Sequence, residues 1–547
     1  MVKKYLVGGL MILLGDFLFL SLFLLGVFPL KLSYFLVLVL ALFFLALKFN
    51  YWFFLFFISV FPLETIVVSP DVFPVGLRPF QLLGLILFLS AVVLHLGKKL
   101  GFVPLSFKKI CIGCRIFRKK DCQTVSSEQA LNSFDRLVIV FGAVSFFGLI
   151  FAPDRWLSLK QNLVLVSFVF LYLLVRNYSQ SLLNKIETAW SFLLGSIPVL
   201  LFGFHQAWAK MLGKKSFEVM DGRINSTFSE PDWLGVYLCF ILAVILVLKI
   251  FVPDSRPGLM VGKSTFEKFS RYALNLFAVL VVGEIFLTVS RSAWLGAFGV
   301  IFAYGLVVFW KFNRSVAWKE LFSFGLVLVL SILLFSFSGL SAFHFANRAT
   351  SSFNGKQKIT ISCLKNSSVP TEISSIKVLA DYNCKHIDLE EIEKERAMGF
   401  EVKEVYRPDP NVEIRKNIYQ KTFVAIFKHP LVGQGLGSSA LLLGYDERGS
   451  GLNASNIFLE IWFSFGIFGL IIFGLIIFLP FFRAFKWFFV LHCFDGELGV
   501  WAVFIGLSTV ALIVPNFFNS GLFLGFFWLY LAFLGSFMEE SFKKRTS

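Results

Sequence analysis

Residues 453–470 read NASNIFLEIWFSFGIFGL, a short polar run followed by an apolar stretch that holds one carboxylate, Glu460. The apolar character continues over residues 456–481. This is long enough to cross a bilayer as a helix, which needs about 20 residues. The stretch therefore predicts a membrane helix whose first turn carries a cluster of polar side chains.

The composition extends this prediction to the whole chain. Of its 547 residues, 57% are hydrophobic and 16% are charged, and the mean hydropathy is +0.78. A soluble domain carries about a quarter charged residues, so the composition predicts an all-α polytopic membrane protein. The first apolar block follows MVKK and lacks a clear small-x-small cleavage site. We interpret it as a retained helix and not as a signal peptide, because a second apolar block follows at once.

About 12 to 14 membrane helices are expected, since apolar blocks of membrane-spanning length recur along the chain. The predicted spans are roughly 5–26, 32–48, 51–68, 79–96, 136–152, 159–175, 188–208, 233–251, 272–289, 293–310, 319–339, 456–481, 498–514 and 517–536.

The net charge of +17 fits the positive-inside rule better than nucleic-acid binding. With both termini in the cytoplasm, the short basic segments fall on the cytoplasmic side. The richest, Lys98 to Lys120, holds eight Lys or Arg within the loop 97–135 and is expected to contact anionic lipids. The long loop 340–455 then lies outside. It separates a helix bundle over 1–339 from C-terminal helices over 456–547.

A part of the long loop, about 357–411, looks soluble. KITISC and IKVLA are β-like, LEEIEKERAMGF is helix-like, and EVKEVYR is β-like again. These runs predict a small α+β module inserted before the twelfth helix. Cys363 and Cys384 fall inside it, where a disulfide is permitted, and they are either bridged or free. The motif CIGC in the basic loop is interpreted as reduced thiols, because a structural zinc site needs four ligands. No metal is expected.

Three polar segments lie at the outer ends of predicted helices, and each brings an arginine. They are RINSTFSEPDWLG with Arg223, TVSRSAWLG with Arg291, and the long segment from Glu413 to Glu460 with Arg415. Helix N-termini favour anions, and a guanidinium group matches phosphate geometry. The pattern predicts a site for phosphate or pyrophosphate, and among apolar helices it favours group transfer from a lipid-linked pyrophosphate.

These segments, in this order, resemble the O-antigen ligase and polymerase family of bacterial membrane glycosyltransferases over roughly residues 190 to 480. The residues that carry the resemblance are Arg223 with STF and Pro231, the SRSAWLG element with Ser290, Arg291 and Trp294, Arg415, the HPLVGQGLG element with Pro430, Gly433, Gly435 and Gly437, then Asn456 and FLEIWFSFGIFGL.

The resemblance implies a GT-C-like enzyme of the bacterial inner membrane that needs no metal and no cofactor. Its donor would be a glycan on undecaprenyl pyrophosphate, and its acceptor a hydroxyl group at the periplasmic face, as in lipopolysaccharide or another surface polysaccharide. It does not separate ligase from polymerase.

The general base is left open, because the family usually has His-Asn where this chain has Ser455-Asn456. A serine hydroxyl is a poor base at neutral pH. Glu460 lies one helical turn after Asn456 and on the same face, so we rank it first as the base. Asp446 and Glu447 follow, and Glu230 comes last.

Two other functions compete with glycan transfer. A transporter or flippase of lipid-linked glycan would place polar residues at mid-membrane, whereas those of this sequence gather at one face. The presence of Ser455 in place of the family's usual histidine favours a non-catalytic protein that binds a lipid phosphate.

Overall fold

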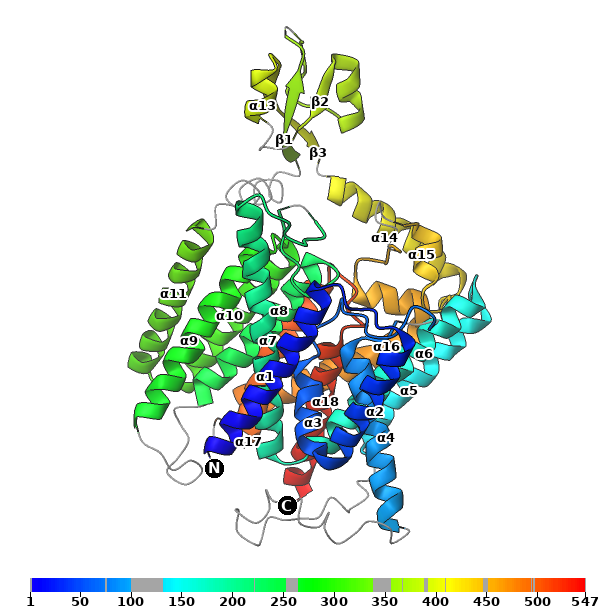
Figure 1. The fold of residues 1–547 in the computed structure, drawn as a ribbon, viewed down its shortest axis with the longest axis vertical. Helices are drawn as coiled ribbons and strands as arrows, with labels where there is room; N and C mark the ends of the chain where they lie inside the picture. Colours follow the sequence, from blue (N-terminus) through cyan, green and yellow to red (C-terminus); the bar gives the residue numbers. More distant parts are fainter. Residues whose placement is uncertain are drawn as a thin grey trace.

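The structure is a computed structural model that describes residues 2–73, 76–99, 131–220, 222–251, 264–337, 356–365, 367–387, 392–408, 410–445, 451–492, 494 and 497–546. It consists of a helix bundle with a small module beyond one end and both termini at the other (Figure 1). Residues 100–130 of the predicted basic loop, which include CIGC, and also Asp446 and Glu447, lie outside the described residues.

Within the described residues, ten helices are long and apolar enough to cross a membrane, and three shorter apolar helices accompany them. The prediction of an all-α polytopic membrane protein is therefore confirmed. The first half of the bundle comprises α1 (Val2–Leu24), α2 (Leu32–Lys48), α3 (Asn50–Ser59), α4 (Pro79–Lys99), α5 (Ser133–Val144), η2 (Ser145–Ile150), α6 (Arg155–Tyr178), α7 (Leu182–Met211) and α8 (Pro231–Phe251).

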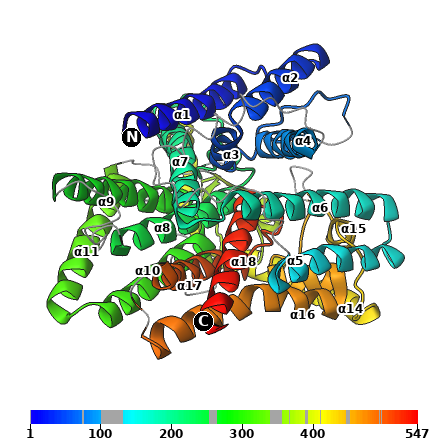
Figure 2. The same ribbon diagram turned by 90° about the horizontal axis from the view of Figure 1, so that it is seen from below.

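The second half packs around α8, which is buried along almost its whole length. Helices α1 to α4 form an outer layer on one side (Figure 2). The remaining helices are α9 (Ser264–Leu287), α10 (Arg291–Lys311), α11 (Arg314–Phe337), α14 (Pro410–Lys428), α15 (Ser438–Leu443), α16 (Ile457–Phe485), η6 (Lys486–Val490), α17 (Glu497–Asn516) and α18 (Gly525–Thr546).

Helix α3 is half as long as the predicted span 51–68. Pro62 has no N–H and disfavours helical geometry at the residue before it, so the helix ends at Ser59. The chain then runs as a buried irregular segment, residues 60–69. Part of this backbone is paired with the segment before α8, because Thr65 N–H donates to Thr227 O (3.0 Å) and the Thr227 hydroxyl donates to Pro62 O (2.6 Å).

The last helix also starts later than predicted. The span 517–536 was expected to follow a tight turn at 515–516, but α17 runs to Asn516 and α18 begins at Gly525. A loop of residues 517–524 lies between them. It is closed by a hydrogen bond of 2.8 Å from Gly521 N–H to Asn516 Oδ1, and side-chain amides and glycine favour such turns over helix.

Helix α16 is broken at Gly466, whose φ of 68° is left-handed. The loop between α14 and α15 packs against the break and bonds to its free backbone groups. Gln434 N–H donates to Phe463 O (2.8 Å), and Gly435 N–H to Ser464 O (3.0 Å). Ile467 N–H donates to Pro430 O (2.8 Å). Irregular backbone in a membrane protein requires such partners.

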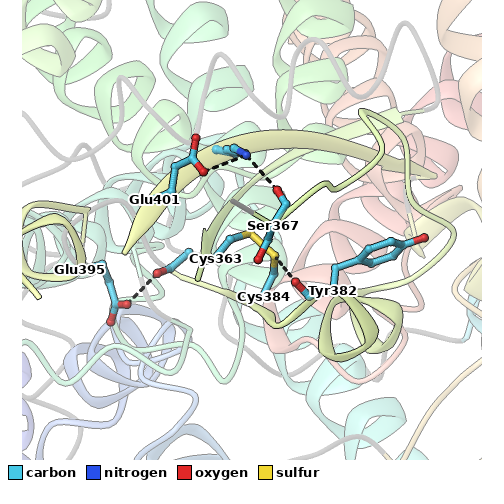
Figure 3. The surroundings of a disulfide bond; sticks show 8 residues. Cys363, Ser367, Tyr382, Cys384, Glu395 and Glu401 are labelled. Carbon is cyan, nitrogen blue, oxygen red and sulfur yellow. Dashed lines mark hydrogen bonds and ion pairs between the residues drawn. A yellow bond between two sulfur atoms is a disulfide. The ribbon is translucent and has the colours of Figure 1, made fainter. Parts of the chain in front are cut away.

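The module contains a three-stranded antiparallel sheet of order β2-β1-β3, with a disulfide that joins Cys363 and Cys384 on neighbouring strands (Figure 3). The predicted strand IKVLA is wrong, since residues 376–382 form a 3₁₀ helix whose Ile376, Leu379 and Tyr382 share one face and pack on the module core. The elements are β1 (Lys356–Cys363), η4 (Ile376–Tyr382), β2 (Cys384–His386), α13 (Ile392–Ala397) and β3 (Glu401–Pro408).

Candidate functional site

Two of the three arginine-bearing segments meet at the start of α8. Arg223 is buried, and its Nε donates to Thr288 O at 3.0 Å. Its Nη2 lies 3.2 Å from Asp232 Oδ1, in the first turn of α8. The Ser290 hydroxyl donates to the same carboxylate oxygen. Segment 223–232 is therefore fixed to segment 288–292 by one shared carboxylate.

The start of α10 places Arg291 beside this contact. Ser290 is the N-cap, and its hydroxyl accepts a hydrogen bond of 3.4 Å from Ala293 N–H. Arg291 is the first helical residue and is half-buried. The Trp294 indole N–H donates to Ile285 O at 3.2 Å, which fixes the turn between α9 and α10.

The third arginine, Arg415, comes from α14. Its Nη2 donates to Phe518 O at 3.4 Å, and its guanidinium carbon lies 5.4 Å from the centre of the Phe518 ring. An arginine over an aromatic ring gains a cation–π attraction. Arg415 is thereby held against the 517–524 loop.

Asn456 caps α16 and reaches the same loop. Its Oδ1 accepts from Phe458 N–H (2.9 Å) and Leu459 N–H (3.2 Å), and its Nδ2 donates to Phe517 O (3.1 Å). The neighbouring Ser455 has a left-handed φ of 49°, and its backbone oxygen accepts from the Tyr419 hydroxyl at 3.4 Å. The N-cap of α16 is therefore Asn456.

The 517–524 loop joins these parts, and the sequence interpretation missed it. Asn519 Nδ2 donates to Ser292 Oγ at 3.0 Å, and Ser292 Oγ lies 3.0 Å from Ser290 Oγ. A chain of contacts thus runs from Arg223 through Asp232 and the two serines to Asn519. The run NFFNSG, residues 516–521, carries the turn residues that signal a loop.

The predicted glycine motif, HPLVGQGLG, packs against the break in α16. The Cβ atoms that side chains would add at Gly433 and Gly435 would lie 2.5 Å from Ser464 O and 2.3 Å from Ser158 Oγ. Both glycines and Gly437 have positive φ. The Trp462 indole also donates to Pro430 O at 3.3 Å. The motif lets the loop touch the broken helix that carries Asn456.

Glu460, our first candidate base, is buried and hydrogen-bonded on both oxygens. It accepts from the Ser439 hydroxyl (2.9 Å) and from Ala454 N–H (2.8 Å). These bonds fix α15 and residue 454 to the first turn of α16. Glu230 directly precedes α8, on the segment that carries Arg223.

The assembled groups suit a multiply charged anion. Three guanidinium groups lie on segments that hydrogen bonds connect, and the N-termini of α8, α10 and α16 lie on the same segments. Helix N-termini and arginines both stabilise phosphate oxygens. Among the described residues, no group of three or more His, Cys, Asp or Glu is arranged to hold a metal ion.

A comparison with protein families finds one domain in this region. Residues 276–474 match the family model described as O-Antigen ligase. The match includes Ser290, Arg291, Arg415 and Asn456, whereas Arg223 and Asn519 lie outside it. No curated protein matches the chain.

Proposed function

Since this chain belongs to the O-antigen ligase and polymerase family, with the matched domain at residues 276–474, we propose that it transfers or polymerises surface polysaccharide. The donor is a glycan linked to undecaprenyl pyrophosphate. The acceptor is a hydroxyl group of a glycan or lipid at the periplasmic face of the inner membrane. The reaction proceeds without a metal ion.

One observation supports the proposal: hydrogen bonds connect the three segments that carry the arginines to the 517–524 loop. Arg223 is tied to segment 288–292, Arg415 to Phe518, and Asn519 links the two sets. A pyrophosphate leaving group carries several negative charges, and pre-organised guanidinium groups stabilise the charge that develops on it. In this scheme Arg223, Arg291 and Arg415 take the role that a metal ion has in other phosphate chemistry.

The remaining predicted residues fit supporting roles in this proposal. Asn456 fixes the first turn of α16 and orients the 517–524 loop through Phe517 O. Glu460 holds α15 against that turn. The candidate bases from the sequence keep their order, with Glu460 first, Asp446 and Glu447 next, and Glu230 last.

The test is a transfer assay with the full-length protein purified in detergent and a mixed extract of undecaprenyl-pyrophosphate glycans. Wild type is compared with Arg291→Ala and Arg415→Ala. The matched control is Arg314→Ala, because Arg314 is exposed and starts α11, which follows the far end of α10. We expect each site variant to lose about 10²-fold in rate, the usual effect of removing one oxyanion-stabilising donor. Arg314→Ala should match wild type.

Two results would overturn glycan transfer. If wild type binds the donor through Arg291 and moves no glycan, the chain is a lipid-phosphate-binding protein. If wild type in sealed vesicles carries lipid-linked glycan across the bilayer without changing it, the chain is a transporter.

A further inference from the structure

The irregular segment 60–69, which is hydrogen-bonded to Thr227, carries a buried carboxylate. Glu64 is 7% exposed, and its Oε1 accepts a hydrogen bond of 2.9 Å from Arg78 Nη1. Its Oε2 is buried and has no hydrogen-bond partner within the described structure. A buried carboxylate oxygen without a hydrogen-bond donor destabilises the fold, so it calls for a functional explanation.

Hydrogen bonds join segment 60–69, which carries Glu64, to the segment that carries Arg223. Thr65 N–H and the Thr65 hydroxyl both donate to Thr227 O, at 3.0 and 3.1 Å, and the Thr227 hydroxyl donates back to Pro62 O at 2.6 Å. Glu64 lies between Pro62 and Thr65. Thr227 lies between Arg223 and Asp232, which form the ion pair of the site. The segment that carries Arg223 thus packs against the segment that carries Glu64.

Two charged groups act on Glu64 from the neighbouring elements. Arg78 directly precedes α4 and pairs with it, and the carboxylate of Glu230, directly before α8, opposes its ionisation. Burial has the largest effect and raises the pKa of Glu64, Arg78 lowers it, and Glu230 raises it, so that the net shift is upward. A carboxylate whose pKa moves toward neutrality is a better general base.

We infer that Glu64 is the proton acceptor for the acceptor hydroxyl in the transfer reaction, with Arg78 as its positioning residue. This inference rests on the proposed function. The site needs such a group, because Ser455 is a poor base and both oxygens of Glu460 already accept hydrogen bonds. Glu64 offers one oxygen fixed by Arg78 and one, Oε2, that accepts no hydrogen bond in the described structure.

The acceptor oxygen attacks the anomeric carbon of the donor glycan and forms the new C–O bond. The bond from that carbon to the pyrophosphate oxygen breaks, and its electron pair leaves with undecaprenyl pyrophosphate, whose charge the arginines stabilise. The hydroxyl proton passes to Glu64 Oε2 and is later released to water.

The first test compares Glu64→Gln with wild type in the transfer assay. The matched control is Glu284→Gln, because Glu284 is also a fully buried carboxylate. We expect Glu64→Gln to lose about 10²- to 10⁴-fold in kcat, the range of general base catalysis. It should still bind the donor, and Glu284→Gln should keep wild-type activity.

The pH profile separates a base from a residue that only supports the fold. Activity should fall on the acid side as Glu64 becomes protonated. Removing the positive charge in Arg78→Gln raises the pKa of Glu64, so the acid limb moves to higher pH. Removing the negative charge in Glu230→Gln lowers it, so the limb moves to lower pH. A merely structural role would leave the limb in place.

The outcomes distinguish this inference from the proposed function. If wild type transfers glycan and Glu64→Gln does so within a few-fold, Glu64 is not the base, and the transferase proposal stands. If the limb does not move in Arg78→Gln and Glu230→Gln, the inference is equally overturned. If wild type transfers nothing while binding donor, the proposed function fails and the inference fails with it.

Discussion

Gly466 is the residue on which the geometry of the site depends most directly. It breaks α16 six residues after Glu460 and ten residues after the N-cap Asn456. A Cβ atom there would lie 2.1 Å from Leu431 O, and the φ of 68° disfavours other residues. The backbone of the HPLVGQGLG loop can enter the break only because this position has no side chain.

We therefore expect Gly466→Ala to destabilise the protein by about 1–3 kcal/mol from backbone strain alone, with the clash in addition. Thermal unfolding in detergent would measure the change. Gly474→Ala is the matched control, since Gly474 lies on the same helix with open space around it. It should be neutral or slightly stabilising, by up to about 1 kcal/mol. Equal effects of the two variants would contradict the packing argument.

The role of a single residue could be predicted from the sequence where the residue type itself indicates that role. The three arginines and the positive-φ glycines of HPLVGQGLG belong to this class. Asn519 and Glu64 do not, because both fell inside predicted spans, 517–536 and 51–68. A hydropathy pattern averages over about 20 residues, so it does not separate a polar side chain in a loop from one in a membrane helix.

At the scale of elements, the long apolar helices were predictable and the interruptions between them were not. Residues 32–48 form α2 with the predicted bounds, and α10 differs by two residues at its start. Segment 60–69 is as apolar as a helix, but its backbone pairs with Thr227 from a distant part of the chain. Such pairing depends on tertiary contacts, which the sequence of one segment does not contain.

The module offers a prediction on the dependence of its stability on pH. Glu395, on α13, accepts from Lys385 Nζ (2.8 Å) and from the Ser362 hydroxyl (2.7 Å), which lower the pKa of this carboxyl. Because the folded-state pKa lies below that of the unfolded chain, the stabilisation is complete at neutral pH. It is lost as the pH falls through the folded-state pKa.

Limited proteolysis of the module at neutral and at acidic pH would measure this effect. Wild type should become easier to cleave at acidic pH, and Glu395→Gln should be easier to cleave already at neutral pH. Glu372→Gln is the control, because Glu372 forms an exposed ion pair with Lys356, and exposed pairs contribute little. If Glu395→Gln resists cleavage as wild type does at neutral pH, the bonds to Lys385 and Ser362 do not stabilise the module.

At the scale of the whole molecule, α18 connects the site to the far end of the bundle. Its first residue follows the 517–524 loop, and its last turns are held by buried ion pairs. Arg176 of α6 lies 3.0 Å from Asp135 Oδ1 and 2.9 Å from Glu539 Oε2. It also donates to the Ser536 hydroxyl at 2.9 Å. The position of α18, and with it the loop that carries Asn519, is fixed from both ends.

Removal of the Arg176 ion pairs should lower the stability of the folded protein. Arg176→Ala leaves two carboxylates without their cation, and loss of one partner of a buried pair costs about 3–5 kcal/mol. We expect a clear drop in the midpoint of thermal unfolding, whereas Arg155→Ala, at an exposed position of the same helix, should leave it unchanged. A wild-type midpoint for Arg176→Ala would show that α18 is held by apolar packing alone.

The sheet of the module has a consequence for how the protein can be engineered. Lys356, where β1 begins, pairs with Pro408, where β3 ends, so the chain enters and leaves the module at neighbouring points. Paired residues on adjacent antiparallel strands lie about 5 Å apart. Because its two ends lie so close together, the module can be deleted and the gap bridged by a few glycines. The same junction would accept a fluorescent protein or an epitope tag as a reporter on this side of the membrane.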